Sequence, residues 1–395
     1  MPYCNVGTTN NGIKIFYRTY GGGPVKVLMI IGLAGTHDSW KPQIEGLVGT
    51  TQANDIDDIW SSEDGVCNGN GNGIEICVFD NRGMGRSSIP KNKSEYTTKI
   101  MAADAISVME HLGWKKAHVF GHSMGGMIAC KVAAVFPDRV LSLALLNVTG
   151  GGYECFPKFD RQTLSIAMRF LMAKTPEQRA AVDLDTHYTQ EYLEQHIGVK
   201  TRRQVLYQGY VEGISATGMQ SNHGFDGQVN ACWTHRISKK EVEVIGKNGL
   251  LISVIHGRCD VIAQISHAKR LAHKLYPLAK MVELPGGHLV SHERSKEVNE
   301  ALLDLIKASE TKTTPFDWTN LSPKPNTSTS NCWTSSSSSR LNSETESSNS
   351  GIAEKMRIMI LYILGLFLVV FEYIKRARVL GCLKPIRVGS ASAVT

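Results

Sequence analysis

Ser123 lies between glycines in the segment Gly121-His122-Ser123-Met124-Gly125. The segment directly follows a predicted strand over residues 117–120 and leads into a helical pattern over residues 124–136. A serine on a sharp strand-to-helix turn is pushed out of the sheet, and glycines on both sides leave room for that turn. The helix N-terminus also favours the negative charge that develops during attack on a carbonyl. The pattern predicts a nucleophilic serine, and a glycine-rich turn that serves packing alone is the alternative.

A serine hydroxyl needs an imidazole to remove its proton and a carboxylate to orient that imidazole. Asp260 follows a predicted strand over residues 250–255, and His288 follows another over residues 279–284. Because the carboxyl ends of parallel strands meet at one edge of a sheet, these side chains can converge on the serine. We therefore predict Asp260 and His288 as its catalytic partners.

Other residues compete for these roles. His122 precedes the serine but points away from the turn, and His292 lies four residues after His288, in the following helix. A supporting role is the alternative for His292. An ordinary surface turn is the alternative for Asp260.

An oxyanion hole requires two backbone N–H donors, one from the residue after the nucleophile and one from the loop after an early strand. Met124 is the first candidate. Leu33 is the second, because it lies in Gly32-Leu33-Ala34-Gly35 after the predicted strand 25–31. Ala34 is the fallback, and a simple turn is the alternative.

The elements that must position these residues alternate between strand and helix from about residue 12 to 150. Apolar runs predict strands, and amphipathic patterns predict helices between them. This alternation predicts a mostly parallel α/β sheet flanked by helices. Strands are expected at 13–17, 25–31, 74–79, 117–120 and 140–147, with helices at 40–48, 97–112 and 124–136 and a surface insertion at 50–73.

Six segments are expected along the chain. Helical signals replace strands after residue 150, and strand patterns resume near residue 250. Residues 311–353 hold 12 serines and few apolar residues, so they cannot bury enough surface to fold. The segments are a first core part (1–150), a helical cap or lid (151–245), a second core part (246–310) closed by a helix over 295–307, a flexible linker (311–353), a membrane segment (354–375) and a basic tail (376–395).

A C-terminal hydrophobic helix is expected within the membrane segment. Residues 358–371 form a run of 14 without a charge, and a helix over 358–374 would span about 25 Å. A typical hydrocarbon layer is about 30 Å thick, so the span is short. A buried soluble helix is the alternative. Because basic residues follow the run, a tail anchor with a translocated tail and a segment that enters and leaves on one side both remain open.

Composition limits the compartment and the partners. Of the formal net charge of +7, most comes from residues 311–395, where ten Lys and Arg face five Asp and Glu. Residues 1–310 therefore lack the excess of basic residues that is typical of nucleic-acid-binding proteins. The nine cysteines form no Cys-x-x-Cys pair and indicate reduced thiols. We expect a membrane-anchored protein whose catalytic part faces the cytosol, on an organelle left open.

Five segments resemble the α/β-hydrolase superfamily over about residues 12–308: Gly32-Leu33-Ala34-Gly35, residues 80–87, residues 121–125, residues 256–260 and Gly286-Gly287-His288. The resemblance implies the chain order serine, acid, histidine and a structural role for residues 80–87. Without a His-Gly pair before Leu33, the chain is more similar to the enol-lactonase and aminoacrylate-hydrolase-like groups.

The resemblance also disfavours some reactions. Epoxide hydrolases and dehalogenases share the loop 80–87 but use an aspartate where this chain has Ser123. The His-x-x-x-x-Asp acyltransferase motif would need Asp at position 293, where Glu293 stands.

The expected activity is hydrolysis of a carboxylic ester, thioester or lactone through an acyl-enzyme on Ser123. The expected partner is a small-molecule or lipid ester substrate, and no metal or organic cofactor is implied. The alternatives are a receptor or binding module with residual hydrolase activity, and a membrane-linked lipase or acyltransferase. A structural adaptor is disfavoured because all three triad residues are present.

Overall fold

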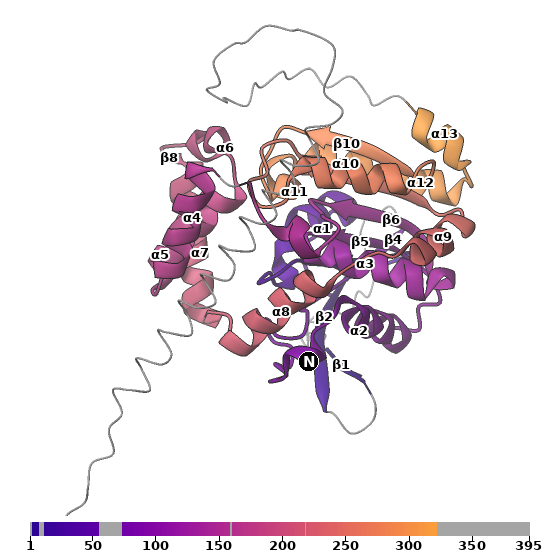
Figure 1. Cartoon of the computed structure of the whole chain (residues 1–395), viewed down its shortest axis with the longest axis horizontal. Coiled ribbons are helices and arrows are strands. Elements are labelled where there is room, and N and C mark those ends of the chain that lie inside the picture. Colours follow the sequence, from indigo (N-terminus) through magenta and orange to yellow (C-terminus); the bar gives the residue numbers. More distant parts are fainter. Residues whose placement is uncertain (1, 8–11, 55–72, 159, 218, 322–395) are drawn as a thin grey trace, which may run out of the picture. The chain divides into compact units, whose positions relative to one another are not determined.

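An eight-stranded, mostly parallel sheet forms the centre of the protein, in the order β1-β2-β4-β3-β5-β6-β9-β10 (Figure 1). The computed structural model describes residues 2–7, 12–54, 73–158, 160–217 and 219–321. β2 runs antiparallel to both of its neighbours, β1 and β4, and the other neighbouring strands of this sheet pair in parallel. The strands are β1 (Tyr3–Val6), β2 (Ile13–Gly21), β3 (Val25–Ile30), β4 (Ile74–Phe79), β5 (Ala117–His122), β6 (Val140–Leu146), β9 (Leu251–Gly257) and β10 (Ala279–Leu284).

Helices cover both faces of this sheet. Successive side chains of a strand point to opposite faces, so the fully buried Leu28 and Met29 of β3 belong to two different core clusters. One cluster packs under α2 (Thr98–His111), α3 (Met124–Val135) and α10 (Ile265–Lys274), and the other under α1 (Lys41–Val48) and α12 (Ser295–Glu310). The predicted α/β fold class is confirmed.

A helical insertion separates β6 from β9, as predicted. In Figure 1, α4 to α7 lie together at the left of the sheet, and α8 leads back toward it. Its apolar residues Leu184, Tyr188 and Leu193 form a small cluster of their own with Leu289 of the core. We call the elements α4 to α9 the insertion: α4 (Arg161–Met172), α5 (Pro176–His187), α6 (Gln190–Glu194), β7 (His196–Ile197), β8 (Lys200–Thr201), α7 (Arg202–Thr217), α8 (Asn222–Thr234) and α9 (Lys239–Lys247).

A short helix, α13 (Pro315–Asn320), lies where a flexible linker was expected, so that expectation is wrong for these residues. Thr314 caps the helix by accepting the N–H of Asp317, and Pro315 occupies its first turn. Trp318 is 2% exposed and donates its indole N–H to the backbone oxygen of Ile252 in β9 at 2.9 Å. One buried aromatic residue therefore overrides the polar composition around it.

Several expectations fall outside the described residues: the membrane segment 354–375, the basic tail 376–395, the linker beyond residue 321, and most of the surface insertion 50–73. Among the described residues, no helix is both long and apolar enough to cross a membrane.

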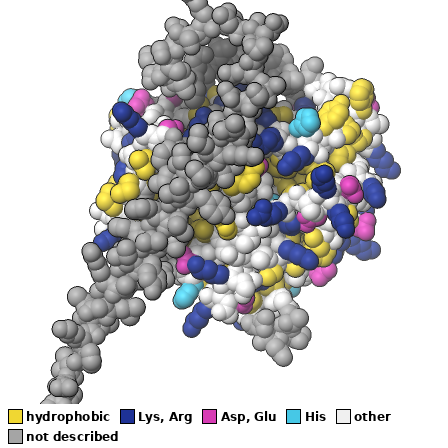
Figure 2. Space-filling view, viewed as in Figure 1, with side chains coloured by type: hydrophobic (Ala, Val, Ile, Leu, Met, Phe, Trp, Pro, Cys, Tyr) yellow, Lys and Arg dark blue, Asp and Glu magenta, His cyan; other side chains and the backbone are white. Residues whose placement is uncertain are grey.

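On the face shown in Figure 2, Lys and Arg side chains are interspersed with acidic and apolar ones.

The expectation of reduced thiols is wrong for Cys259, which is disulfide-bonded. A disulfide depends on the spatial approach of two backbones, which sequence spacing does not reveal. The other described cysteines are free: Cys4, Cys77, Cys130, Cys155 and Cys232.

Candidate active site

The turn at Ser123 connects β5 to α3 and has a strained backbone, with φ 54° and ψ −120°. The Ser123 N–H donates to the Leu146 oxygen of β6 at 2.8 Å. A Cβ atom on Gly121 would lie 2.3 Å from the oxygen of Gly125, and one on Gly125 would lie 2.0 Å from the oxygen of Ile30. Both glycines are therefore required for the helix to approach the sheet this closely.

The structure brings Ser123, His288 and Asp260 together, as the sequence predicts. His288 Nε2 lies 3.1 Å from Ser123 Oγ, and His288 Nδ1 lies 2.8 Å from Asp260 Oδ2. The three residues follow β5, β10 and β9 at the carboxyl edge of the sheet. The arrangement links a hydroxyl, an imidazole and a carboxylate in one hydrogen-bonded chain.

The Asp260 carboxylate is held by three further donors. Oδ1 accepts the N–H groups of Ile262 and Ala263 at 2.8 and 2.9 Å, and Oδ2 accepts the side-chain amide of Asn147 at 2.7 Å. Burial opposes ionisation, but His288, His256 and Asn147 together outweigh it and lower the pKa of Asp260 to about 2. An ionised Asp260 favours the proton on His288 Nδ1 and leaves Nε2 free to accept the serine proton.

Asn147 is a site residue that the sequence analysis missed. It follows β6 with a positive φ of 48°, and its side chain also donates to the Gly287 oxygen at 3.2 Å. Asn147 therefore joins the acid to the loop that carries His288. Its place at the carboxyl end of a predicted strand, where the triad residues also lie, could have indicated a role in the site.

The turn over residues 32–35 packs directly against the nucleophile. A Cβ atom on Gly32 would lie 2.9 Å from Ser123 Cβ. The N–H of Ala34 donates to Gln228 Oε1 at 2.9 Å. Within the described residues, the N–H groups of Leu33 and Met124 have no hydrogen-bond partner. Of the two residues considered in this turn, only Leu33 thus has an N–H to offer a substrate.

Gln228 is a second site residue that the sequence analysis missed. It comes from α8 of the insertion, is fully buried, and donates its side-chain amide to the oxygen of Arg82 at 3.0 Å. Its Oε1 fixes the Ala34 N–H, so a helix of the insertion holds the turn beside the serine. A single glutamine in a helix of mixed polar and apolar residues carries no sequence signal for this role.

The two competing histidines, His122 and His292, hydrogen-bond to residues around the triad. His122 Nε2 donates to the backbone oxygen of His288 at 2.8 Å, and burial lowers the pKa of His122 to about 3. His292 uses both ring nitrogens, Nδ1 with the Tyr188 hydroxyl at 2.9 Å and Nε2 with the Ser39 oxygen at 2.8 Å. Neither ring hydrogen-bonds to the serine.

Glu293, at the position where the acyltransferase motif would need Asp, binds the insertion. Its Oε1 accepts the N–H groups of Gly287 and Thr189 at 2.9 and 2.8 Å, and its Oε2 accepts the Thr189 hydroxyl at 2.7 Å. Burial raises the pKa of Glu293. The side chain therefore ties the N-cap of α6 to the residue before His288.

The loop over residues 80–87 has contacts that support its predicted structural role. Asp80 Oδ1 accepts the backbone N–H of His37 at 2.8 Å, and the Asn81 side chain donates to the Ile31 oxygen at 2.7 Å. Arg82 forms a buried two-point pair with Asp104, with both distances 2.6 Å. The Asn81 bond braces the strand end that precedes the turn 32–35, and the other bonds join the loop to His37 and to α2.

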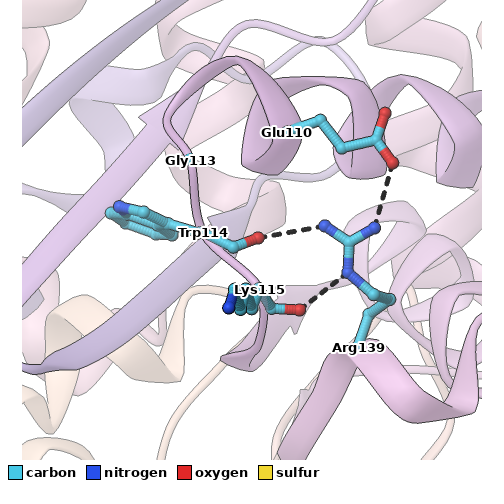
Figure 3. Close-up of a pocket in the computed structure, with 5 residues that line it drawn as sticks. All are labelled: Glu110, Gly113, Trp114, Lys115 and Arg139. Atoms are coloured by element: carbon cyan, nitrogen blue, oxygen red, sulfur yellow. Dashed lines mark hydrogen bonds and ion pairs between the residues drawn. The ribbon is translucent and has the colours of Figure 1, made fainter.

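A surface hollow of about 410 Å³ lies away from this site, lined by Glu110, Gly113, Trp114, Lys115 and Arg139 (Figure 3). Its residues precede β5 and β6, whereas the catalytic candidates follow their strands. The Arg139 guanidinium is held by Glu110 and by the oxygens of Trp114 and Lys115 at 2.7–3.0 Å. The donors of Arg139 are therefore paired with groups of the protein itself.

Across the part of the chain that the structure describes, no cluster of three or more His, Cys, Asp or Glu could hold a metal.

Solved structures share this fold. The enol-lactonase from Burkholderia xenovorans LB400 has a TM-score of 0.58 and 22% identity, over 78% of this chain and 100% of that one. A thermophilic esterase from Thermogutta terrifontis has a TM-score of 0.56 and 19% identity, over 78% and 98%. At these identities the likeness concerns the fold.

Sequence comparison identifies the family. The carbamate hydrolase predicted for Azorhizobium caulinodans, RutD, is 29% identical over 177 residues, which are 45% of this chain and 54% of that protein. The match thus spans about half the length of this curated relative. The model of the alpha/beta hydrolase fold family matches residues 26–295. The chain therefore belongs to the α/β-hydrolase fold family.

Proposed function

We propose that this protein is a serine hydrolase that cleaves a carboxylic ester, thioester or lactone through an acyl-enzyme on Ser123. The observation that carries the proposal is the continuous contact from Ser123 through His288 to the ionised Asp260. This geometry suits removal of the serine proton during nucleophilic attack.

In the proposed reaction, His288 Nε2 takes the hydroxyl proton as Ser123 Oγ attacks the substrate carbonyl. The N–H groups of Leu33 and Met124 stabilise the resulting oxyanion. His288 then protonates the leaving alcohol or thiol, and the acyl group stays on the serine. Water, deprotonated by the same imidazole, releases the acid and restores the hydroxyl.

The comparisons support this reaction class in general terms. Two structures of the same fold are named as an enol-lactonase and an esterase, and the matched curated relative is named as a carbamate hydrolase. All three names describe hydrolysis at a carbonyl carbon.

A fluorophosphonate probe tests the nucleophile directly, because it reacts with activated serines. The folded protein should become labelled at Ser123, and Ser123→Ala should remain unlabelled. Folded wild-type protein that resists the probe would exclude the proposal. Multiple turnovers on p-nitrophenyl esters would separate an enzyme from a receptor, which would react once and release no further product.

We also propose that residues 354–375 attach the protein to a membrane. The support is the uncharged run over 358–371. The full chain should resist carbonate extraction from membranes, since a hydrophobic span is not released by screening of charge. The double variant L364R/L368R should become extractable, whereas S337R/S338R adds the same charge outside the run. Equal behaviour of the two variants would exclude the anchor.

A further inference from the structure

His187, the last residue of α5, stacks on the candidate catalytic histidine. Its ring centroid lies 5.9 Å from that of His288, and the two ring planes differ by 28°. Among the histidines around the triad, His187 comes from the insertion, which the sequence predicts to be a cap or lid. Its ring therefore lies beside the imidazole that transfers the proton.

The backbone of His187 contacts the residues that flank His288. The His187 oxygen accepts the N–H of Leu289, the residue after His288, at 2.9 Å. Gly287, the residue before His288, also lies close to this oxygen, because a Cβ atom on Gly287 would be 2.7 Å from it. The backbone of His187 is thus fixed beside the residues on both sides of His288.

The ring nitrogens of His187 differ from those of its neighbours. Nδ1 is enclosed and has no partner, and within the described residues the side chain makes no hydrogen bond at all. By contrast, His122 and His292 both donate to backbone oxygens. An enclosed N–H without an acceptor is costly, so the single proton of a neutral ring belongs on Nε2.

The ring stays neutral in the folded protein. Burial, aided by the neighbouring His288, lowers the pKa of His187 to about 3. A neutral ring does not repel the imidazolium that forms on His288 during attack. It can still donate one hydrogen bond.

We propose that His187 is a specificity-determining residue whose Nε2–H donates a hydrogen bond to a substrate oxygen outside the reacting carbonyl. The substrate class is then an ester, thioester or lactone with an ether or hydroxyl oxygen near that carbonyl. The inference rests on the proposed function, because it assumes that the substrate carbonyl lies at Ser123. A site with an unpaired donor discriminates against analogues that lack the matching oxygen.

Two isosteric substrate pairs test the inference. On the acyl side, p-nitrophenyl methoxyacetate replaces one methylene of p-nitrophenyl butyrate by oxygen. On the alcohol side, 2-methoxyethyl acetate does the same for butyl acetate. For each pair, the ratio of kcat/KM between the ether and its carbon analogue is measured in wild type and variants. Comparing these ratios between proteins cancels the intrinsic reactivity of the substrates.

His187→Phe keeps the stacked ring and removes the donor. It should lower the ether-to-carbon ratio by about 3- to 10-fold in at least one pair, the usual effect of losing one hydrogen bond. His187→Asn restores a donor and should recover part of that ratio. His196→Phe is the matched control, since His196 is an exposed histidine of the same insertion, and it should leave both ratios unchanged.

Unchanged ratios in both pairs for His187→Phe would overturn the inference. Should that variant fail to fold, His187→Asn and His187→Leu provide the comparison, and equal ratios for these two would overturn it as well. Turnover that survives Ser123→Ala would instead refute the proposed function. The two failures are therefore distinguishable.

Discussion

Glu293 accepts the N–H of Gly287 at 2.9 Å, directly before the histidine of the triad. The same carboxylate accepts two hydrogen bonds from Thr189 of the insertion. One side chain therefore positions both the loop that carries His288 and the start of α6. A glutamine has only one acceptor oxygen and would direct its NH₂ group at a donor. Glu293→Gln should therefore lower kcat on p-nitrophenyl acetate by roughly 10-fold and increase proteolysis within the insertion.

Glu300→Gln is the control for this prediction, because Glu300 is an exposed residue of α12. It should leave both turnover and proteolysis unchanged. Normal turnover of Glu293→Gln would show that the histidine loop holds its position without this carboxylate.

Gln228 should act on the rate more than on substrate binding. Gln228→Leu removes the bond that fixes the Ala34 N–H, so the turn 32–35 loses its support and the oxyanion is stabilised less. We expect kcat to fall by about 10-fold with a smaller change in KM. Asn230→Leu is a matched control on the same helix, because Asn230 binds the oxygens of Lys93 and Tyr96 instead. Equal effects of the two variants would indicate a general loss of α8 packing.

Asp260→Asn should lower turnover by roughly 10³–10⁴-fold, since an amide does not hold the imidazole in the required tautomer. Asn147→Ala should cost much less, because Asp260 keeps its bonds from Ile262 and Ala263. Steady-state kinetics on one ester would measure both. Near-normal turnover of Asp260→Asn would mean that another carboxylate orients His288.

Trp318 should stabilise the fold although it follows the last helix of the catalytic core. Its indole is buried and bonded to β9, so Trp318→Ala should lower the free energy of unfolding by roughly 3 kcal/mol. Phe316→Ala removes an aromatic residue that is 64% exposed on the same helix and should cost under about 0.5 kcal/mol. Truncation after residue 310 should likewise be less stable than truncation after residue 321. Urea denaturation would measure these differences, and equal midpoints would refute the role of α13.

Glu154 should make stability depend on acid pH. Burial opposes its charge, but hydrogen bonds from His267, Gly150 and Arg270 outweigh burial and lower the pKa of Glu154 from 4.5 to about 2. A folded-state pKa below the unfolded value contributes stability above about pH 4.5 that is lost as pH falls toward 2.

Glu154→Gln should therefore lower the free energy of unfolding at pH 7 by about 2–3 kcal/mol. The difference from wild type should shrink between pH 5 and pH 2. Glu243→Gln, at an exposed position of α9, should show no such trend. A pH-independent difference for Glu154→Gln would assign the loss to packing.

The parts of the fold that sequence could predict are those with strong apolar periodicity. The strands Ile74–Phe79 and Ala279–Leu284 have the predicted bounds, because both are mostly apolar and are followed by turn residues. By contrast, β1 has four residues at the edge of the sheet, and α10 is mostly polar with a narrow apolar stripe. The β1 pattern does not exceed that of an ordinary loop, whereas α10 was missed although Ile265, Ala268 and Leu271 are spaced as on one face of a helix.

The same distinction applies to the site. Ser123, Asp260 and His288 could be predicted because each follows a recognisable strand within a characteristic turn. Gln228 and Glu293 act through contacts with segments more than 100 residues away, and such contacts depend on how the insertion folds back.

The bonds of Glu293 and of the His187 oxygen make the α5–α6 corner of the insertion its fixed end. A movement that lifted this corner would pull residues 287–289 with it and break the alignment of His288 with Ser123. Within the described residues, α4 makes no hydrogen bond to this loop, and its Leu164, Met168 and Leu171 are at least half exposed. A substrate entrance that keeps the triad aligned is therefore expected beside α4 rather than at the α5–α6 corner.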